Sequence, residues 1–169
     1  DELTRAFNRQ YFHESLKREV SRVQRYRRCL SVAILDIDGF KEINDSYGHM
    51  AGDAILQAFV SLITANIRES DLLARYGGDE FALMLPEIAP APALTVCEKL
   101  RSLVAAHPFA FKGQTVPVTT SIGLQSYDHS DGEVTRSELI AAADARLYEA
   151  KQAGRNCVRA ARRAASSGT

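Results

Sequence analysis

Residues 71–85 read DLLARYGGDEFALML, two short apolar runs separated by a pair of glycines. Runs of this length next to glycine predict β-strands, and Gly77-Gly78 suits the positive φ angles of a tight hairpin. The stretch therefore predicts two strands joined by a two-residue turn. Two acids, Asp79 and Glu80, follow the glycines directly, and adjacent side chains in a strand point to opposite faces of the sheet.

The segments on either side alternate between strand and helix signals. The run LSVAILDID (30–38) predicts a buried strand ending in acids, with Asp36 and Asp38 on one face if the chain stays extended. Apolar residues at helical spacing, a proline start after Pro86 and a stop at Gly154 predict the helices. The predicted helices are 8–28, 39–49 (a short helix and loop), 51–70, 89–107 and 136–154, and the other strands are 114–127, broken at Pro117, and 156–160.

The order of these elements predicts the fold class. From residue 30 onward it is β-α-α-β-β-α-β-α-β, which mixes a hairpin with helical crossovers. Such an order is typical of an α+β fold in which a mostly antiparallel five-stranded sheet is flanked by helices, in the ferredoxin-like manner. We expect one domain over residues 1–160 and a flexible tail over 161–169.

Composition is that of an ordinary globular domain, with 46% hydrophobic residues, 25% charged residues and a formal net charge of zero. This balance gives no argument for a nucleic-acid polymer as partner, and the basic residues between 17 and 28 are best explained as a solvated helix flank. No apolar run approaches the ~20 residues of a membrane span. Three cysteines without a CxxC pair suit a reducing compartment, so we expect a cytoplasmic domain. Because the chain starts without methionine, we also expect a missing N-terminal sensory or dimerisation region, with which the full-length protein could be membrane-anchored.

The chemistry must come from carboxylates at strand ends. The sequence has no P-loop, GxGxxG, HExxH or GxSxG motif, and its four histidines lack metal-ligand spacing. If the hairpin lies beside the first strand, Asp36 can meet Asp79 or Glu80 at one sheet edge. Carboxylates without histidine or cysteine suit a hard ion such as Mg²⁺ or Mn²⁺, which shares its ligand shell with phosphates. The simpler alternative for each acid pair alone is a solvated strand end.

Five motifs, in the same order, resemble those of the GGDEF-domain diguanylate cyclases, the enzymes that join two GTP molecules into cyclic di-GMP. GGDEF at 77–81 is the signature for which the family is named. The resemblance covers nearly the whole chain and implies a nucleotidyltransferase of bacterial signalling. The motifs are DELTRAFNR (1–9), DIDGFKEINDSYGHMAGDAIL (36–56), ARYGGDEFALMLP (74–86), TTSIG (119–123) and ADARLYEAKQAGRN (143–156).

The resemblance implies a role for each acid. Asp36 and Asp79, with the backbone carbonyl of Ile37, match the family's metal ligands. Glu80 matches the second signature acid, which the family requires for activity and which is a candidate ligand of a second ion. Two Mg²⁺ or Mn²⁺ ions per active site are thereby implied. Asp38 belongs to the same motif, and we expect a structural role for it.

The resemblance also implies the contacts to the substrate. Asn44 and Asp53 match the guanine-binding pair. Guanine offers two N–H donors to a carboxylate and O6 to an amide, whereas adenine would leave the carboxylate unpaired, so Asp53 favours GTP over ATP. The alternative for Asp53 is a residue placed for the helix dipole, and both can hold. The remaining matches are Lys151 and Arg155 at the terminal phosphates, for which the alternative is an ordinary helix C-terminus, and Phe40, Lys41, Gly77 and Gly78 beside the nucleotide.

A product-binding site is implied by the RxxD pattern of residues 68–71, RESD. Arg68 and Asp71 match the family's inhibitory site, where cyclic di-GMP binds away from the active site. Lys99, where the family often has arginine, is a candidate third residue. The alternative is an ion pair at a helix end.

The same resemblance predicts how the enzyme works as an assembly. One domain binds one GTP, so catalysis requires a homodimer, and we expect the fragment alone to be mostly monomeric and weakly active. The presence of Asp36, Asp79 and Glu80 favours an active, product-inhibited cyclase. The alternative is a catalytically silent GGDEF domain that serves as a receptor for GTP or cyclic di-GMP.

Overall fold

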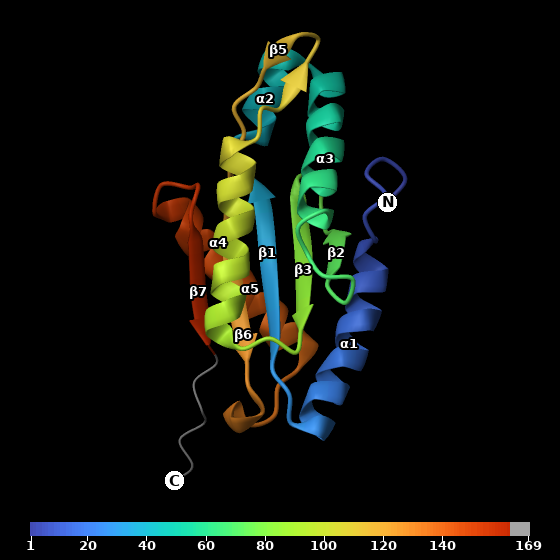
Figure 1. Ribbon diagram of the computed structural model, residues 1–169, viewed down its shortest axis with the longest axis vertical. Coiled ribbons are helices and arrows are strands. Elements are labelled where there is room, and N and C mark those ends of the chain that lie inside the picture. The colour runs from blue at the N-terminus through green and yellow to red at the C-terminus, as the bar shows by residue number, and fades with distance from the viewer. Residues whose placement is uncertain (163–169) are drawn as a thin grey trace.

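The computed structural model describes residues 1–162 and has the predicted α+β fold. Its five-stranded sheet has the order β2-β3-β1-β6-β7, with helices on both faces (Figure 1). All neighbouring pairs are antiparallel except β6 and β7, which are parallel. The strands are β1 (Leu30–Ile37), β2 (Leu72–Arg75), β3 (Glu80–Pro86), β6 (Thr120–Tyr127) and β7 (Val158–Arg162).

The sheet is buried on both faces. α3 (His49–Thr64) and α4 (Pro90–Ala106) pack on one face, and α1 (Arg9–Tyr26) and α5 (Arg136–Gln152) pack on the other. Figure 1 shows α4 in front of the sheet and α5 behind it. β1 reads as an unbroken apolar run because its alternate side chains enter two cores, Leu35 that of α3 and α4 and Ile34 that of α1 and α5.

Local signals explain where the helices begin. The Asn8 side chain accepts a hydrogen bond from the Tyr11 N–H at 2.8 Å and starts α1, and Thr135 does the same for α5. α4 begins at Pro90, as its proline start predicts. The helix predicted over 51–70 begins earlier, at His49, and ends at Thr64, so that the RxxD segment lies in the connection to β2.

The glycine hairpin differs from the prediction. Four residues, rather than two, separate β2 from β3, and the N–H groups of Tyr76 and Gly77 both donate to the Glu80 carbonyl, at 2.8 and 3.0 Å. Neither Gly77 nor Gly78 has a positive φ, so the prediction that they serve a tight two-residue turn is wrong. The longer turn needs no left-handed residue. A β-carbon added at Gly78 would have no other atom within 4 Å, so this glycine borders open space.

Two further differences lie outside the main sheet pattern. The segment predicted as one strand over 114–127 contributes β5 (Gln114–Thr115) to a small hairpin with β4 (Ala110–Phe111), and β6 starts only at Thr120. This hairpin lies at the same end of the molecule as α2 (Phe40–Tyr47) (Figure 1). At the C-terminus, β7 includes the first two residues of the predicted tail, and 163–169 lie outside the described residues. No helix within residues 1–162 combines the length and apolar character needed to cross a bilayer.

Candidate active site

The predicted metal and phosphate residues gather at one end of the central strands. β1 ends at Ile37 and β3 begins at Glu80, and the antiparallel register pairs Asp36 with Glu80. A cavity of about 190 Å³ lies at this end. Its lining includes Asp36, Ile37, Phe40, Lys41, Asp79, Lys151 and Arg155, which the sequence separates by up to 119 positions.

An ion pair crosses this cavity. Lys151, in the last turn of α5, donates from Nζ to Oδ2 of Asp36 at 2.6 Å. Burial raises the pKa of Asp36 to about 6; the bond to Lys151 works against this increase and the Asp79 carboxylate adds to it. Burial lowers the pKa of Lys151, but its bond to Asp36 and the charges of the surrounding acids outweigh burial and leave it raised. The site therefore favours additional positive charge.

Only two of the three carboxylates predicted to bind a divalent ion lie in this cavity. Within residues 1–162, no three histidine, cysteine or acidic side chains converge as a ready metal site. Asp36 and Asp79 share the cavity, and neighbouring carboxylate oxygens are ligands that Mg²⁺ and Mn²⁺ prefer. A cation between them would offset the repulsion that helps to raise the pKa of Asp36. These two residues fit the implied ion.

Glu80 instead lines a second cavity, of about 320 Å³, on the α1 and α5 side of the sheet. There Asp144 of α5 faces it, and burial and this second carboxylate raise the pKa of Glu80. Asp79 and Glu80 thus separate into two cavities, as adjacent strand residues should. Sequence reasoning missed Asp144, although it precedes Lys151 by seven residues, two helical turns along the same face.

The raised pKa of Asp36 predicts a pH-dependent stability. The carboxyl titrates near 6 in the folded protein and near 3.8 when unfolded, so the folded state binds this proton more tightly. The contribution of this group to the free energy of unfolding is present below pH 4 and is lost as the pH rises through 6. We expect Asp36→Asn to be more stable than the wild type at pH 8 and the difference to shrink toward pH 4.5. Urea unfolding at several pH values measures this difference, and a gap that stays constant with pH would contradict the shift.

The start of α2 supplies the anion-binding side of the cavity. Gly39 caps the helix in a left-handed conformation, with φ 63°, and the N–H groups of Phe40 and Lys41 lie in the first turn, where they have no intrahelical acceptor. Both residues line the cavity, together with Arg155 from the loop after α5. Free helix N–H groups and cationic side chains are the partners that phosphate groups prefer.

Asn44 and Asp53 lie beyond this cavity, on α2 and α3. Asn44 is one helical turn after Phe40, and its buried Oδ1 has no hydrogen-bond partner among the described residues. Asp53 is exposed in α3. Between them, Gly52 makes room for the amide, because a β-carbon at this position would overlap Asn44 Oδ1. Sequence reasoning did not identify Gly52, whose role depends on the packing of α2 against α3.

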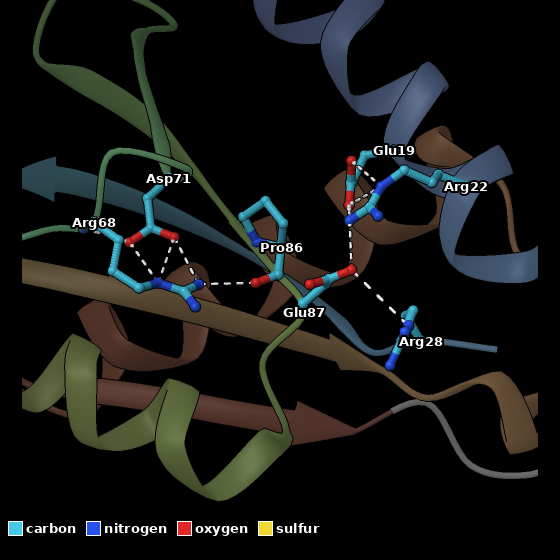
Figure 2. Close-up of polar contacts among 7 residues, drawn as sticks. All are labelled: Glu19, Arg22, Arg28, Arg68, Asp71, Pro86 and Glu87. Atoms are coloured by element: carbon cyan, nitrogen blue, oxygen red, sulfur yellow. Dashed lines mark hydrogen bonds and ion pairs between the residues drawn. The ribbon is translucent and has the colours of Figure 1, made fainter. Parts of the chain in front are cut away.

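The RxxD residues are bonded to each other, as Figure 2 shows. Arg68 donates from Nη2 to Asp71 Oδ1 at 2.8 Å and also to the Pro86 carbonyl at 2.8 Å, at the end of β3. The Asp71 side chain is 2% exposed, whereas that of Arg68 is 49% exposed. Arg68 therefore presents its guanidinium to solvent while Asp71 holds it from behind. Lys99 is exposed on α4.

Residues 1–157 match the protein family described as diguanylate cyclase, GGDEF domain. Diguanylate cyclase DgcP of Pseudomonas aeruginosa is 39% identical over 92% of this chain and 23% of its own length. Diguanylate cyclase DosC of Escherichia coli is 41% identical over 94% of this chain and 34% of its own length. The chain thus spans about a quarter to a third of these curated relatives.

Solved structures show the same architecture. The GGDEF domain of TpbB (YfiN) from Pseudomonas aeruginosa superposes with a TM-score of 0.90 at 37% identity, covering 95% of this chain and 93% of that one. The GGDEF domain of DgcB from Caulobacter crescentus, solved in complex with c-di-GMP, gives 0.88 at 33% identity, with coverages of 95% and 94%.

Proposed function

The chain belongs to the GGDEF-domain diguanylate cyclases, and we propose that it is an active member, which condenses two GTP molecules into cyclic di-GMP and two pyrophosphates. The observation that carries the proposal is the cavity in which Asp36 and Asp79 stand beside Lys151 and Arg155. Several carboxylates and several cations in one cavity suit a nucleoside triphosphate bound with a divalent ion.

Different residues of the cavity bind the phosphates and the divalent ion. The first-turn N–H groups of α2 and the side chains of Lys151 and Arg155 bind the β- and γ-phosphates. Lys151 exchanges its bond to Asp36 for a phosphate oxygen, which frees Asp36 to join Asp79 and the Ile37 carbonyl as ligands of Mg²⁺ or Mn²⁺. When bound, such an ion supplies charge neutralisation at the α-phosphate and at the departing pyrophosphate.

Base recognition falls to Asn44 and Asp53. Guanine O6 is a hydrogen-bond acceptor, so Asn44 would bind it through its side-chain N–H group, whereas Oδ1 is itself an acceptor and lies against Gly52. Asn44 and Asp53 together offer an amide and a carboxylate, which match the O6 and N–H edge of guanine. We propose GTP rather than ATP as the substrate for this reason.

Glu80 completes the proposed machinery from the neighbouring cavity. Its position directly after Asp79 and its half-buried carboxyl support a role as a ligand of a second ion, reached by a side-chain rotation.

One domain holds one GTP, so the attacking 3′-hydroxyl comes from the GTP of a facing domain. Catalysis therefore needs a homodimer.

Cyclic di-GMP formation measured over a wide range of protein concentration tests this function. With GTP and Mg²⁺, we expect the product to increase more steeply than linearly with protein, because the active species is a dimer. Fusion to a dimerising coiled coil should remove that dependence and raise the specific activity. GTP binding without product, in the free and in the fused domain alike, would support the receptor alternative instead.

We also propose that cyclic di-GMP inhibits the enzyme through Arg68, with Asp71 and Lys99 in supporting roles. Exposed guanidinium groups bind phosphates and the Hoogsteen edge of guanine, and Asp71 keeps the Arg68 guanidinium in place. Lysine offers a point charge where arginine would offer a planar fork, so Lys99 should contribute less than an arginine.

Replacing Arg68 with alanine should raise the cyclic di-GMP concentration that gives half-inhibition about tenfold or more, the loss expected for one charged hydrogen-bond donor. The initial rate without product should stay unchanged. Arg22→Ala is a matched control, because Arg22 forms ion pairs of 2.8 and 2.9 Å with Glu19 and Glu87 near the same end of β3 (Figure 2). Equal inhibition of all three proteins would contradict the proposed site.

A further inference from the structure

The loop that carries Arg155 has an uncommon backbone. Gly154, Arg155 and Asn156 follow α5 with φ values of 105°, 64° and 45°. Three consecutive left-handed residues are rare, because only glycine adopts this conformation without steric cost and asparagine tolerates it better than arginine. Such a conformation persists where surrounding contacts hold it, and it is often found at functional sites.

The first of these contacts comes from Asp38 at the end of β1. Its Oδ2 accepts hydrogen bonds from the Asn156 N–H at 3.0 Å and from the Thr119 hydroxyl at 2.7 Å. Its Oδ1 accepts from the Ser121 hydroxyl at 2.6 Å. The carboxylate therefore ties the loop to β6, and the Thr119 and Ser121 bonds leave it little freedom to rotate.

The second contact comes from α4, on which Arg101 lies. Its Nη1 donates to Oδ1 of Asn156 at 2.9 Å, and its Nε pairs with Glu98 at 3.0 Å. The backbone and the side chain of Asn156 are thus held by two different elements. The Arg155 side chain, one position earlier, lines the cavity with Asp36 and Asp79.

We propose that Asp38, Arg101 and Asn156 are positioning residues that hold the 154–156 loop so that Arg155 faces the phosphate cavity. α4 thereby contributes to substrate binding without lining the cavity. The proposal rests on the proposed function only where it assigns Arg155 to a phosphate. It gives Asp38 a defined structural role, as the acceptor of a hydrogen bond from the loop backbone.

The test compares two nucleotides on the Arg101→Gln variant, with Arg22→Gln as a control that removes a surface arginine elsewhere. 3′-Deoxy-GTP with Mg²⁺ has all three phosphates but no attacking hydroxyl, and 3′-deoxy-GMP lacks the phosphates that Arg155 would bind. We expect Arg101→Gln to weaken 3′-deoxy-GTP binding about fivefold, the order expected for one orienting hydrogen bond, and to leave 3′-deoxy-GMP binding unchanged. Arg101→Lys, which keeps most of the length and the positive charge of the donor, should recover part of the loss.

Amide hydrogen exchange of residues 153–157 gives an independent readout, and we expect it to be faster in Arg101→Gln than in the wild type or the control. An equal loss for both nucleotides would indicate a general structural effect and overturn the proposal, as would unchanged binding and exchange. A wild-type domain that binds neither nucleotide would contradict the proposed function. In that case the exchange data alone would test whether Arg101 holds the 154–156 loop. Unchanged exchange in Arg101→Gln would overturn that proposal.

Discussion

Replacing Asp79 with asparagine should reduce cyclic di-GMP formation by about 10³-fold or more. The neutral amide removes one of the two carboxylates proposed as metal ligands in the cavity that Lys151 lines, and a lost ligand charge of this kind is worth several kcal/mol in metal-assisted phosphoryl transfer. Chromatographic quantification of the product from GTP and Mg²⁺, on the coiled-coil fusion to avoid limitation by dimerisation, measures the loss.

The same substitution should leave the protein at least as stable as the wild type. The Asp79 carboxylate is one of the groups that raise the pKa of Asp36, so its removal relieves a like-charge repulsion. Thermal unfolding checks this, and it separates a chemical defect from a folding defect. Glu14→Gln, which neutralises an exposed acid of α1, is the control. A variant that keeps more than about a tenth of the wild-type activity would contradict the role of Asp79.

Replacing Gly123 with alanine should lower the free energy of unfolding by about 3 kcal/mol or more. Gly123 lies in β6 opposite Ile34 of β1, and α5 passes directly over it. A β-carbon there would overlap the Ala143 carbonyl oxygen and the Leu147 nitrogen. These are backbone atoms, which cannot rotate away as a flexible side chain can, so α5 must shift and overpacking of this kind is costly.

Gly78→Ala is the matched control for this prediction. At Gly78 the added β-carbon would meet no atom within 4 Å, so stability measured by urea unfolding should be unchanged. Its nucleotide affinity should fall instead, because the family resemblance implies that Gly78 lies beside the nucleotide, and an added methyl group would occupy the open space there. Equal unfolding free energies for Gly123→Ala and the wild type would show that α5 can withdraw from β6 without cost.

Several features were predictable because they depend on neighbours in the sequence. The apolar run of β1 predicted a buried strand, and the proline start after Pro86 predicted the beginning of α4, and the structure confirms both. The hairpin, by contrast, has a longer turn than Gly77-Gly78 suggested, because a second hydrogen bond to Glu80 closes it without left-handed residues. A glycine in the sequence indicates only that the backbone is free of a side chain at that position. Either a tight turn or a closely approaching ligand can require this.

In the candidate site, too, some features were predictable from the sequence and others depend on tertiary packing. Asp36, Asp79, Lys151 and Arg155 were recognisable from their motifs, and the structure places all four in one cavity. The 2.6 Å bond between Asp36 and Lys151 joins residues 115 positions apart, and no local pattern predicts such a contact. The separation of Glu80 into a second cavity with Asp144, and the three bonds to Asp38, also depend on how α5 and β6 pack against β1.

The sequence by itself determined the family, the element order and the residue types available for chemistry, since periodicity, capping and motif spacing are local properties of the chain. Only the tertiary structure decided which acids share a cavity, which glycines are needed for close packing, and what holds the Arg155 loop. Those features arise where segments up to 119 residues apart in the sequence meet, and their energies depend on burial and on distances of a few ångströms that no local pattern encodes.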